Sequence, residues 1–167
     1  MRRIGPARPA RVASQREAGG ARGKRFVILA SQFHEPLSRA LIDGAVRTLR
    51  RHGASTGAIR VVWVPGAFEL PVVAARLVRR RPHPHAVIAL GALIKGGTPQ
   101  YAVLANAVAA GLTEVSVRTG VPVTFGVIVA KTLAQARARA GGSKGNRGEE
   151  AALAALAVLK LLNDSRL

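Results

Sequence analysis

Short apolar runs alternate along most of this chain with longer stretches in which apolar residues recur every three or four positions. The runs FVILA and AVIAL are continuous, as expected for strands that are buried on both faces of a sheet. The longer stretches have the period of amphipathic helices. The pattern predicts strands at 26–30, 59–64, 86–92 and 123–129, and helices at 36–52, 68–80, 100–119, 132–140 and 147–163.

Strands that alternate with helices are typical of a parallel sheet covered by helices on both faces. We therefore predict an α/β fold. The predicted helices 100–119 and 147–163 are rich in alanine, and the segment AALAALAVLKLLN is apolar on more than one face. It is either an ordinary core helix or a helix that is partly covered by another subunit.

The length and composition indicate a single globular domain without disulfides or membrane spans. A chain of 167 residues fits one domain with a core of its own. The chain has no cysteine, which excludes disulfides and thiolate metal sites and permits a reducing compartment. No apolar run reaches the roughly eighteen residues that span a bilayer. We expect a soluble, cytoplasmic protein without membrane contact.

The charge is strongly basic, with 26 lysines and arginines against 8 acidic residues and a formal net charge of +18. Such a charge attracts anions, either phosphate substrates or nucleic acid, and does not choose between them. Residues 1–24 are rich in arginine and contain few large apolar side chains, so we predict a disordered tail with non-specific nucleic-acid contacts. The tail fits a plain basic arm or an upstream-extended start. It is Arg-rich and acid-poor like an organellar transit peptide, but Ser14 is its only hydroxyl residue and no amphipathic stripe appears, which disfavours that reading.

The segment GALIKGGTPQY, residues 91–101, carries the first candidate site. A strand runs into a glycine-rich turn, Gly96, Gly97 and Thr98, and a helix follows directly. Free backbone amides at a helix N-terminus favour a bound anion, so the turn is a candidate phosphate site. The segment matches neither the Walker pattern nor GxGxxG, and such a turn alone is often only structural.

Further motifs follow other predicted strands. SQFH (31–34) and VPGAFELP (64–71) come at strand ends, where open α/β sheets bind ligands, and the second contains the carboxylate of Glu69. A basic glycine-rich break, RAGGSKGNRGEE (139–150), separates the last two helices. Together these segments predict a ligand site at one edge of the sheet.

These motifs, with PVTFG (122–126), stand in the order found in the lumazine synthase family, and the chain resembles that family over about residues 25–163. The resemblance implies a three-layer sandwich with a four-stranded parallel, flavodoxin-like sheet flanked by helices. It divides the chain into a basic tail (1–24), a lumazine synthase-like domain (25–163) and a C-terminal tail (164–167).

The resemblance also implies a reaction. It is the condensation of 5-amino-6-(D-ribitylamino)uracil with 3,4-dihydroxy-2-butanone 4-phosphate to 6,7-dimethyl-8-ribityllumazine, in riboflavin biosynthesis. No metal and no redox cofactor are implied. The implied assembly is a homo-pentamer, extended in some members to a shell of 60 subunits.

The resemblance assigns two groups of residues. The ribitylaminouracil would contact Phe33, His34, Ala67, Phe68, Glu69, Ala92, Leu93, Ile94, Phe125 and Arg147, and the phosphate would contact Gly96, Gly97, Thr98 and Arg139. Phe125 and Arg139 would come from a neighbouring subunit. Without the resemblance, Phe33 could be a core residue, Glu69 a first-turn acid favoured by the helix dipole, and Arg139 a solvated arginine.

The chain departs from the family at Gln100, where a histidine is usual and is proposed to relay protons, oriented by a carboxylate that corresponds to Glu150. An amide cannot exchange a proton near neutral pH. His34 also departs from the usual asparagine. We expect a slow synthase; the alternative is a catalytically weak shell or a ligand- and polyanion-binding protein. A flavodoxin-like regulator is disfavoured, because no aspartate stands at a strand end as phosphoacceptor.

Overall fold

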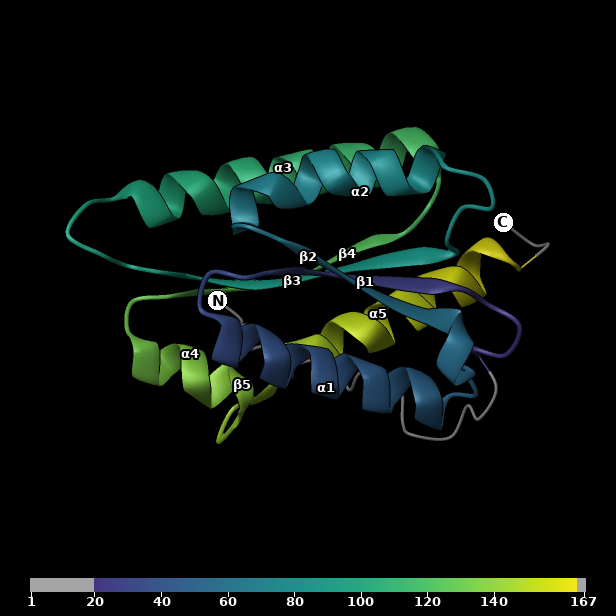
Figure 1. The fold of residues 1–167 in the computed structure, drawn as a ribbon, viewed down its shortest axis with the longest axis horizontal. Helices are drawn as coiled ribbons and strands as arrows, with labels where there is room; N and C mark the ends of the chain where they lie inside the picture. Colours follow the sequence, from purple (N-terminus) through teal and green to yellow (C-terminus); the bar gives the residue numbers. More distant parts are fainter. Residues whose placement is uncertain (1–19, 165–167) are drawn as a thin grey trace, which may run out of the picture.

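The computed structural model describes residues 20–164 (Figure 1). Most of the predicted tail, residues 1–19, and the last three residues lie outside this range. The described elements are β1 (Phe26–Ser31), α1 (Glu35–Arg51), the 3-10 turn η1 (Thr56–Ala58), β2 (Ile59–Val64), the 3-10 turn η2 (Ala67–Glu69), α2 (Leu70–Arg79), β3 (Ala86–Ile94), α3 (Gln100–Thr119), β4 (Val123–Ala130), α4 (Leu133–Arg139), β5 (Ala140–Gly142), β6 (Gly145–Asn146) and α5 (Arg147–Leu162).

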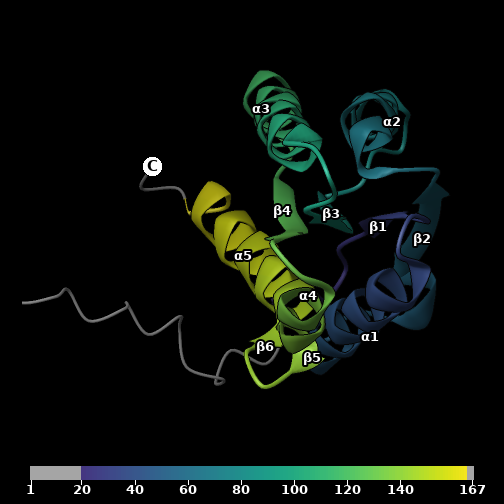
Figure 2. The same ribbon diagram turned by 90° about the vertical axis from the view of Figure 1, so that its left-hand side faces the viewer.

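The predicted fold class is confirmed. β1 to β4 form one parallel sheet in the order β2-β1-β3-β4, which is the doubly wound arrangement. Figure 2 shows the three layers: α2 and α3 cover one face of the sheet, while α1, α4 and α5 cover the other. The strand order reverses between β1 and β3, so the loops after these two strands diverge and leave room for a ligand.

Each face of the sheet has its own core. Along β1, Phe26, Ile28 and Ala30 face α1 and α5, and the alternate residues Val27 and Leu29 face α2 and α3. This alternation explains the continuous apolar run FVILA, since both faces of the strand are buried.

Several predicted boundaries are off by one residue, and three differences are larger. The helix expected at 68–80 is divided into η2 and α2, and Pro71 lies in the first turn of α2, where its missing N–H does no harm. β3 extends to Ile94, two residues further than predicted. The break at 139–150 contains the small hairpin β5–β6, which the sequence pattern did not indicate.

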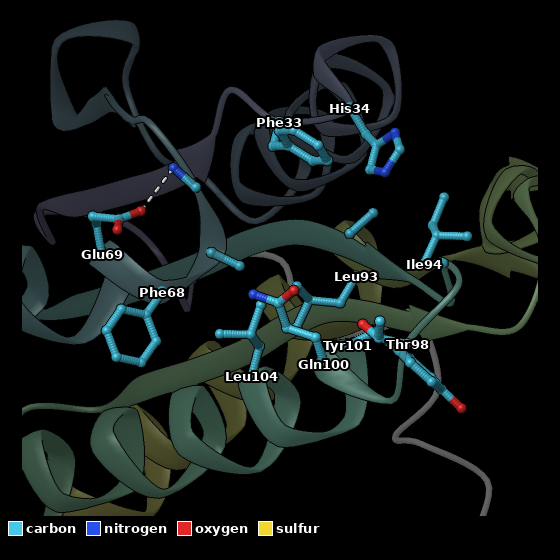
Figure 3. Close-up of a pocket in the computed structure, with 14 residues that line it drawn as sticks. Phe33, His34, Phe68, Glu69, Leu93, Ile94, Thr98, Gln100, Tyr101 and Leu104 are labelled. Atoms are coloured by element: carbon cyan, nitrogen blue, oxygen red, sulfur yellow. Dashed lines mark hydrogen bonds between the residues drawn. The ribbon is translucent and has the colours of Figure 1, made fainter.

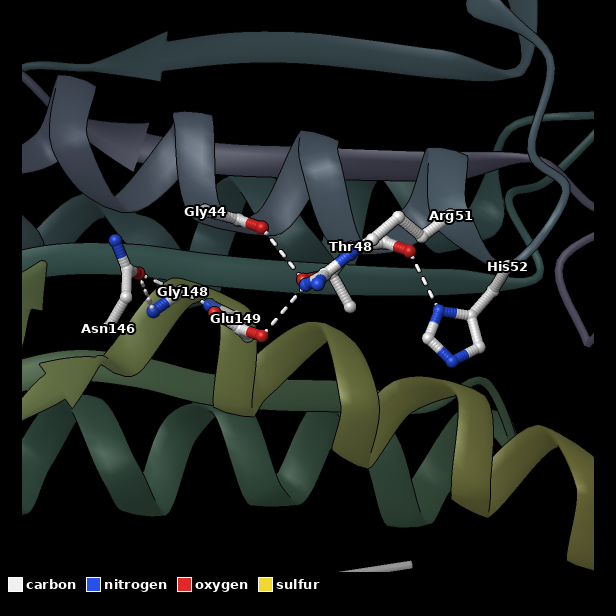
Figure 4. A network of polar contacts seen from close by, with 7 residues as sticks. All are labelled: Gly44, Thr48, Arg51, His52, Asn146, Gly148 and Glu149. Carbon is white, nitrogen blue, oxygen red and sulfur yellow. Dashed lines mark hydrogen bonds and ion pairs between the residues drawn. The ribbon is translucent and has the colours of Figure 1, made fainter. Parts of the chain in front are cut away.

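The start of α5 is fixed to α1 by Asn146 (Figure 4). Its Oδ1 accepts hydrogen bonds from the amides of Gly148 and Glu149 at 2.8 and 3.2 Å, and its Nδ2 donates to the carbonyl of Ala40 at 2.9 Å. A Cβ at Gly148 would collide with the carbonyl of Leu41, so the crossing of the two helices requires glycine there. The segment GNRG therefore has a structural task as well as a candidate role in the site.

The folded part begins before residue 25. Ala21 is fully buried and its amide donates to the carbonyl of His52 at 3.0 Å. Among the described residues, no helix is long and apolar enough to cross a membrane.

Candidate functional site

A pocket of about 350 Å³ lies where the strand order reverses (Figure 3). Three loops and the first turns of α3 contribute to it. The lining residues are Phe33, His34, Gly66, Ala67, Phe68, Glu69, Ala92, Leu93, Ile94, Gly96, Thr98, Gln100, Tyr101 and Leu104. The structure thus brings together ten of the fourteen residues that the resemblance assigned to substrate or phosphate, together with Gln100.

The loop after β1 presents an aromatic ring and an imidazole. Phe33 is 68% exposed, so it is not the core residue that its place at a strand end allowed. His34 has the left-handed backbone conformation, with φ 61° and ψ 44°, which asparagine and histidine tolerate better than most side chains. The two rings make an edge-to-face contact at 4.9 Å. The amide of Phe33 donates to the carbonyl of Pro65 at 3.1 Å, which holds this loop against the next one.

The loop after β2 presents Glu69 and Phe68 at one end of the pocket, as Figure 3 shows. One carboxylate oxygen of Glu69, Oε2, accepts the amide of Gly66 at 2.9 Å. This bond closes the η2 turn, so the structural role considered for Glu69 is real. The other carboxylate oxygen has no such partner within the described chain and can accept hydrogen bonds from a ligand.

The end of β3 supplies backbone and the glycine-rich turn. Ala92 is buried, while Leu93 and Ile94 are half-buried at the pocket wall. Within the described residues, the amides of Gly96, Gly97 and Thr98 donate to no protein acceptor, and no side chain caps the start of α3. A Cβ added at Gly96 or Gly97 would meet no atom within 4 Å, so the turn borders open space. Free amides before a helix of 20 residues favour an anion at this point.

The ionisable side chains in the lining are few: His34, Glu69 and Tyr101. Gln100, the first residue of α3, is exposed and adds an amide rather than an acid or a base. In Figure 3 the His34 ring lies on the Ile94 side of the pocket, away from Phe68 and Glu69. The pocket therefore has a carboxylate at one end and an imidazole at the other.

Four assigned residues lie apart from this pocket within one chain: Phe125, Arg139, Arg147 and Glu150. Phe125 is 38% exposed on β4, the edge strand, and Arg139 is exposed at the end of α4. Arg147 and Glu150 form an ion pair with each other, with Nη1 2.6 Å from Oε2, in the first turn of α5. Gly97 belongs to the turn but does not line the cavity.

The side of the molecule that carries Phe125 is apolar. β4 forms the open edge of the sheet between α3 and α5 (Figure 2). Large exposed apolar residues occur on all three elements: Val103, Val117, Phe125, Val129, Val158, Leu161 and Leu162. An apolar surface next to an unpaired strand edge is typical of a face that contacts another chain.

Gly66, Tyr101 and Leu104 line the pocket although the sequence pattern assigned no role to them. Gly66 could have been found, because it lies inside the motif PGAFELP. Tyr101 and Leu104 stand three positions apart, so they share one face of α3. That spacing is the only signal in the sequence that points to them.

The comparison with known proteins agrees with the motifs. Residues 23–163 match the family model described as 6,7-dimethyl-8-ribityllumazine synthase. A protein of that name from Desulfotalea psychrophila is 43% identical over 143 residues, covering 86% of this chain and 92% of that protein. Those from Thermus thermophilus and Leuconostoc mesenteroides are 42% and 40% identical, covering 85% and 83% of this chain and 90% and 88% of the relatives.

Proposed function

We propose a function for this chain from its family, since it belongs to the 6,7-dimethyl-8-ribityllumazine synthases, a family of transferases. The proposed product is 6,7-dimethyl-8-ribityllumazine. The proposed substrates are 5-amino-6-(D-ribitylamino)uracil and 3,4-dihydroxy-2-butanone 4-phosphate. One observation carries the proposal: a single pocket collects an exposed aromatic ring, a carboxylate and a turn of free amides. These are the groups that a pyrimidine, a polyol and a phosphate require. The reaction then depends on positioning two polar substrates and on moving protons.

We assign the ribitylaminouracil to the side of the pocket formed by the first two loops. The face of Phe33 stacks on the pyrimidine ring, a type of contact worth about 1–3 kcal/mol with nucleic-acid bases. The free oxygen of Glu69 accepts ribityl hydroxyls through charge-assisted hydrogen bonds, next to Ala67 and Phe68. The backbone of Ala92, Leu93 and Ile94 contacts the edge of the pyrimidine.

We assign the phosphate of the four-carbon substrate to the amides of Gly96, Gly97 and Thr98. The turn offers dipoles but no cation of its own that lines the pocket. Arg139 supplies the missing positive charge from a neighbouring subunit, and Phe125 closes the pocket across the same interface. Arg147 is assigned to the uracil carbonyls. The apolar surface on α3, β4 and α5 supports such a neighbour. We propose the homo-pentamer; the 60-subunit shell and the cytoplasmic location remain predictions.

We assign the proton transfers to His34. Gln100 cannot exchange a proton, and the Glu69 carboxylate is already assigned to the ribityl hydroxyls. His34 carries the one imidazole in the pocket lining, and the two ring nitrogens of an imidazole can donate one proton and accept another. Its proton would go to the hydroxyl that leaves as water when the amine and ketone form the imine. The imine nitrogen then loses its proton to the neutral ring. Glu150 remains a predicted partner for a histidine at position 100.

A second candidate is a ligand-binding or polyanion-binding protein that keeps the fold with little catalysis. Gln100 and the formal charge of +18 favour it. The set of polar groups around one pocket favours the enzyme, because a scaffold does not require them.

Two variants on α4 test the assignment. Arg137 and Arg139 are both exposed on that helix, and only Arg139 is assigned to the phosphate. Arg139→Gln should raise KM for the phosphate substrate by roughly 10–100-fold, since it removes a charge-assisted contact worth about 1.5–3 kcal/mol. Arg137→Gln should leave KM within about twofold of wild type. An equal change in both variants would contradict the phosphate assignment.

A further inference from the structure

A second cleft, of about 310 Å³, lies at the opposite ends of the same strands. It forms where β1 and β2 begin and α2 ends, far from the carboxyl ends that build the pocket. Its lining residues are Arg25, Phe26, Val27, Gly57, Ala58, Arg60, Leu77, Arg80, Arg81, Pro82 and Pro84. Four of them are arginines and none is acidic.

The positive charge in this cleft is not neutralised by the described chain. Glu35, Glu114, Glu149 and Glu150 each form an ion pair with an arginine outside this cleft. Arg25 donates to the carbonyl of His83 at 3.0 Å. Arg60, Arg80 and Arg81 are exposed and make no side-chain hydrogen bond or ion pair with any described residue.

The dipole of α2 explains only some of the arginines around this cleft. Arginines near the C-terminus of α2 interact favourably with its dipole, which accounts for Arg79 and Arg80. Arg25 and Arg60 lie at the starts of two strands, where no helix end attracts them. Without an anion, four guanidinium groups around one cleft repel each other.

The neighbouring His85 reports the same positive field. Its Nδ1 accepts the amide of Arg25 at 2.9 Å. Burial, together with repulsion from Arg25, Lys24 and His83, lowers the pKa of His85 below its ordinary value.

We propose that this cleft binds the sugar–phosphate backbone of a single-stranded nucleic acid, independently of the function proposed for the pocket. Guanidinium groups bind phosphate oxygens in bidentate geometry. Lys24 and Arg79 extend the positive charge beyond the cleft, which fits a chain of phosphates better than one phosphate. Leu77 and Pro82 offer apolar contact to the sugars.

The same composition determines the kind of binding. Phe26 is the one aromatic residue in the lining and is only 1% exposed, so bases have no ring on which to stack. Recognition is therefore electrostatic, indifferent to sequence and sensitive to salt.

Fluorescence anisotropy with labelled oligothymidylate of about 20 nucleotides tests the proposal on the full chain. The triple variant Arg60→Gln, Arg80→Gln, Arg81→Gln should bind about tenfold or more weakly at low salt. The slope of log K against log salt should fall by about 2 in magnitude, at roughly 0.7 for each phosphate that the protein no longer neutralises.

The control triple is Lys131→Gln, Arg137→Gln, Lys144→Gln, which removes three exposed charges around α4 and β5–β6. It leaves the basic tail and changes net charge equally, and it should keep the wild-type slope within about 0.5. Equal losses in the two triples would overturn the proposal, and so would displacement of the oligonucleotide by an acidic peptide of the same charge at the same concentration.

NMR titration of His85 gives a second readout. Bound phosphates beside Arg25 should raise the pKa of His85 in the wild-type protein, since an adjacent anion favours the charged imidazole. The cleft triple should lose this response and the control triple should keep it. Unchanged His85 titration at saturating oligonucleotide would place the binding elsewhere and overturn the proposal.

Discussion

Replacing Asn146 tests whether the GNRG segment positions α5. Asn146 is 8% exposed, and Asn146→Ala removes two kinds of hydrogen bond at once. Loss of the helix cap to Gly148 and Glu149 costs about 1 kcal/mol. Loss of the Nδ2 donor removes a hydrogen bond to Ala40, whose carbonyl lies inside α1 and keeps its intrahelical acceptor role, so this loss costs about 0.5–1.5 kcal/mol more.

The expected decrease in the free energy of unfolding is therefore about 1.5–2.5 kcal/mol. For a domain of this size, that lowers Tm by roughly 3–10 °C. Thermal unfolding followed by circular dichroism measures it. The subunit concentration must be fixed, because assembly also shifts Tm.

Asn163→Ala is the matched control. Asn163 is exposed at the end of α5, and its Nδ2 donates to the carbonyl of Leu159 at 2.8 Å. Its loss should change stability by no more than about 0.5 kcal/mol. Asn146→Asp should retain the cap and lose only the bond to Ala40, so its Tm should fall between those of Asn146→Ala and wild type. If Asn146→Ala and Asn163→Ala had the same Tm, the proposed role of Asn146 would be wrong.

Three further substitutions test the chemistry of the pocket. Gln100→His should raise kcat by up to about 10²-fold with little change in KM, as expected for an added proton relay. Steady-state kinetics measures both constants. An unchanged kcat would mean that substrate positioning, and not proton transfer, limits the rate. His34→Asn should lower kcat by about 10²-fold and flatten its pH profile, while asparagine tolerates the left-handed backbone; an unchanged pH profile would exclude His34 as proton carrier. The double variant His34→Asn, Gln100→His should recover much of the kcat that His34→Asn loses. Phe33→Ala should raise the Kd of the ribitylaminouracil, measured by calorimetry, by about 5–150-fold, and an unchanged Kd would remove the stacking assignment.

The strands and the sheet could be predicted because their signal is local. FVILA and AVIAL are continuous apolar runs, and the two faces of the sheet that bury them follow from that pattern alone. Since parallel strands end at one edge, the motifs SQFH and PGAFELP and the turn Gly96–Thr98 were expected to meet, and residues from all three line one pocket.

The remaining features depend on contacts that no local pattern contains. The hairpin β5–β6 has strands of three and two residues, too short to show a period. The roles of Asn146 and Gly148 arise from α1, about 100 residues away in the sequence. Phe125 and Arg139 lie outside the pocket of a single chain, so their assignment depends on the assembly rather than on the fold.

Formation of the lumazine by the purified protein tests the central proposal most directly. Both substrates are mixed with the protein, and lumazine absorbance is followed against a reaction without protein. We expect a rate above the uncatalysed one that saturates in both substrates, and a higher rate with Gln100→His. If neither wild type nor Gln100→His accelerated the reaction, and if neither substrate bound, the proposal that the protein is a lumazine synthase would be contradicted. The polyanion-binding protein would then be the remaining candidate.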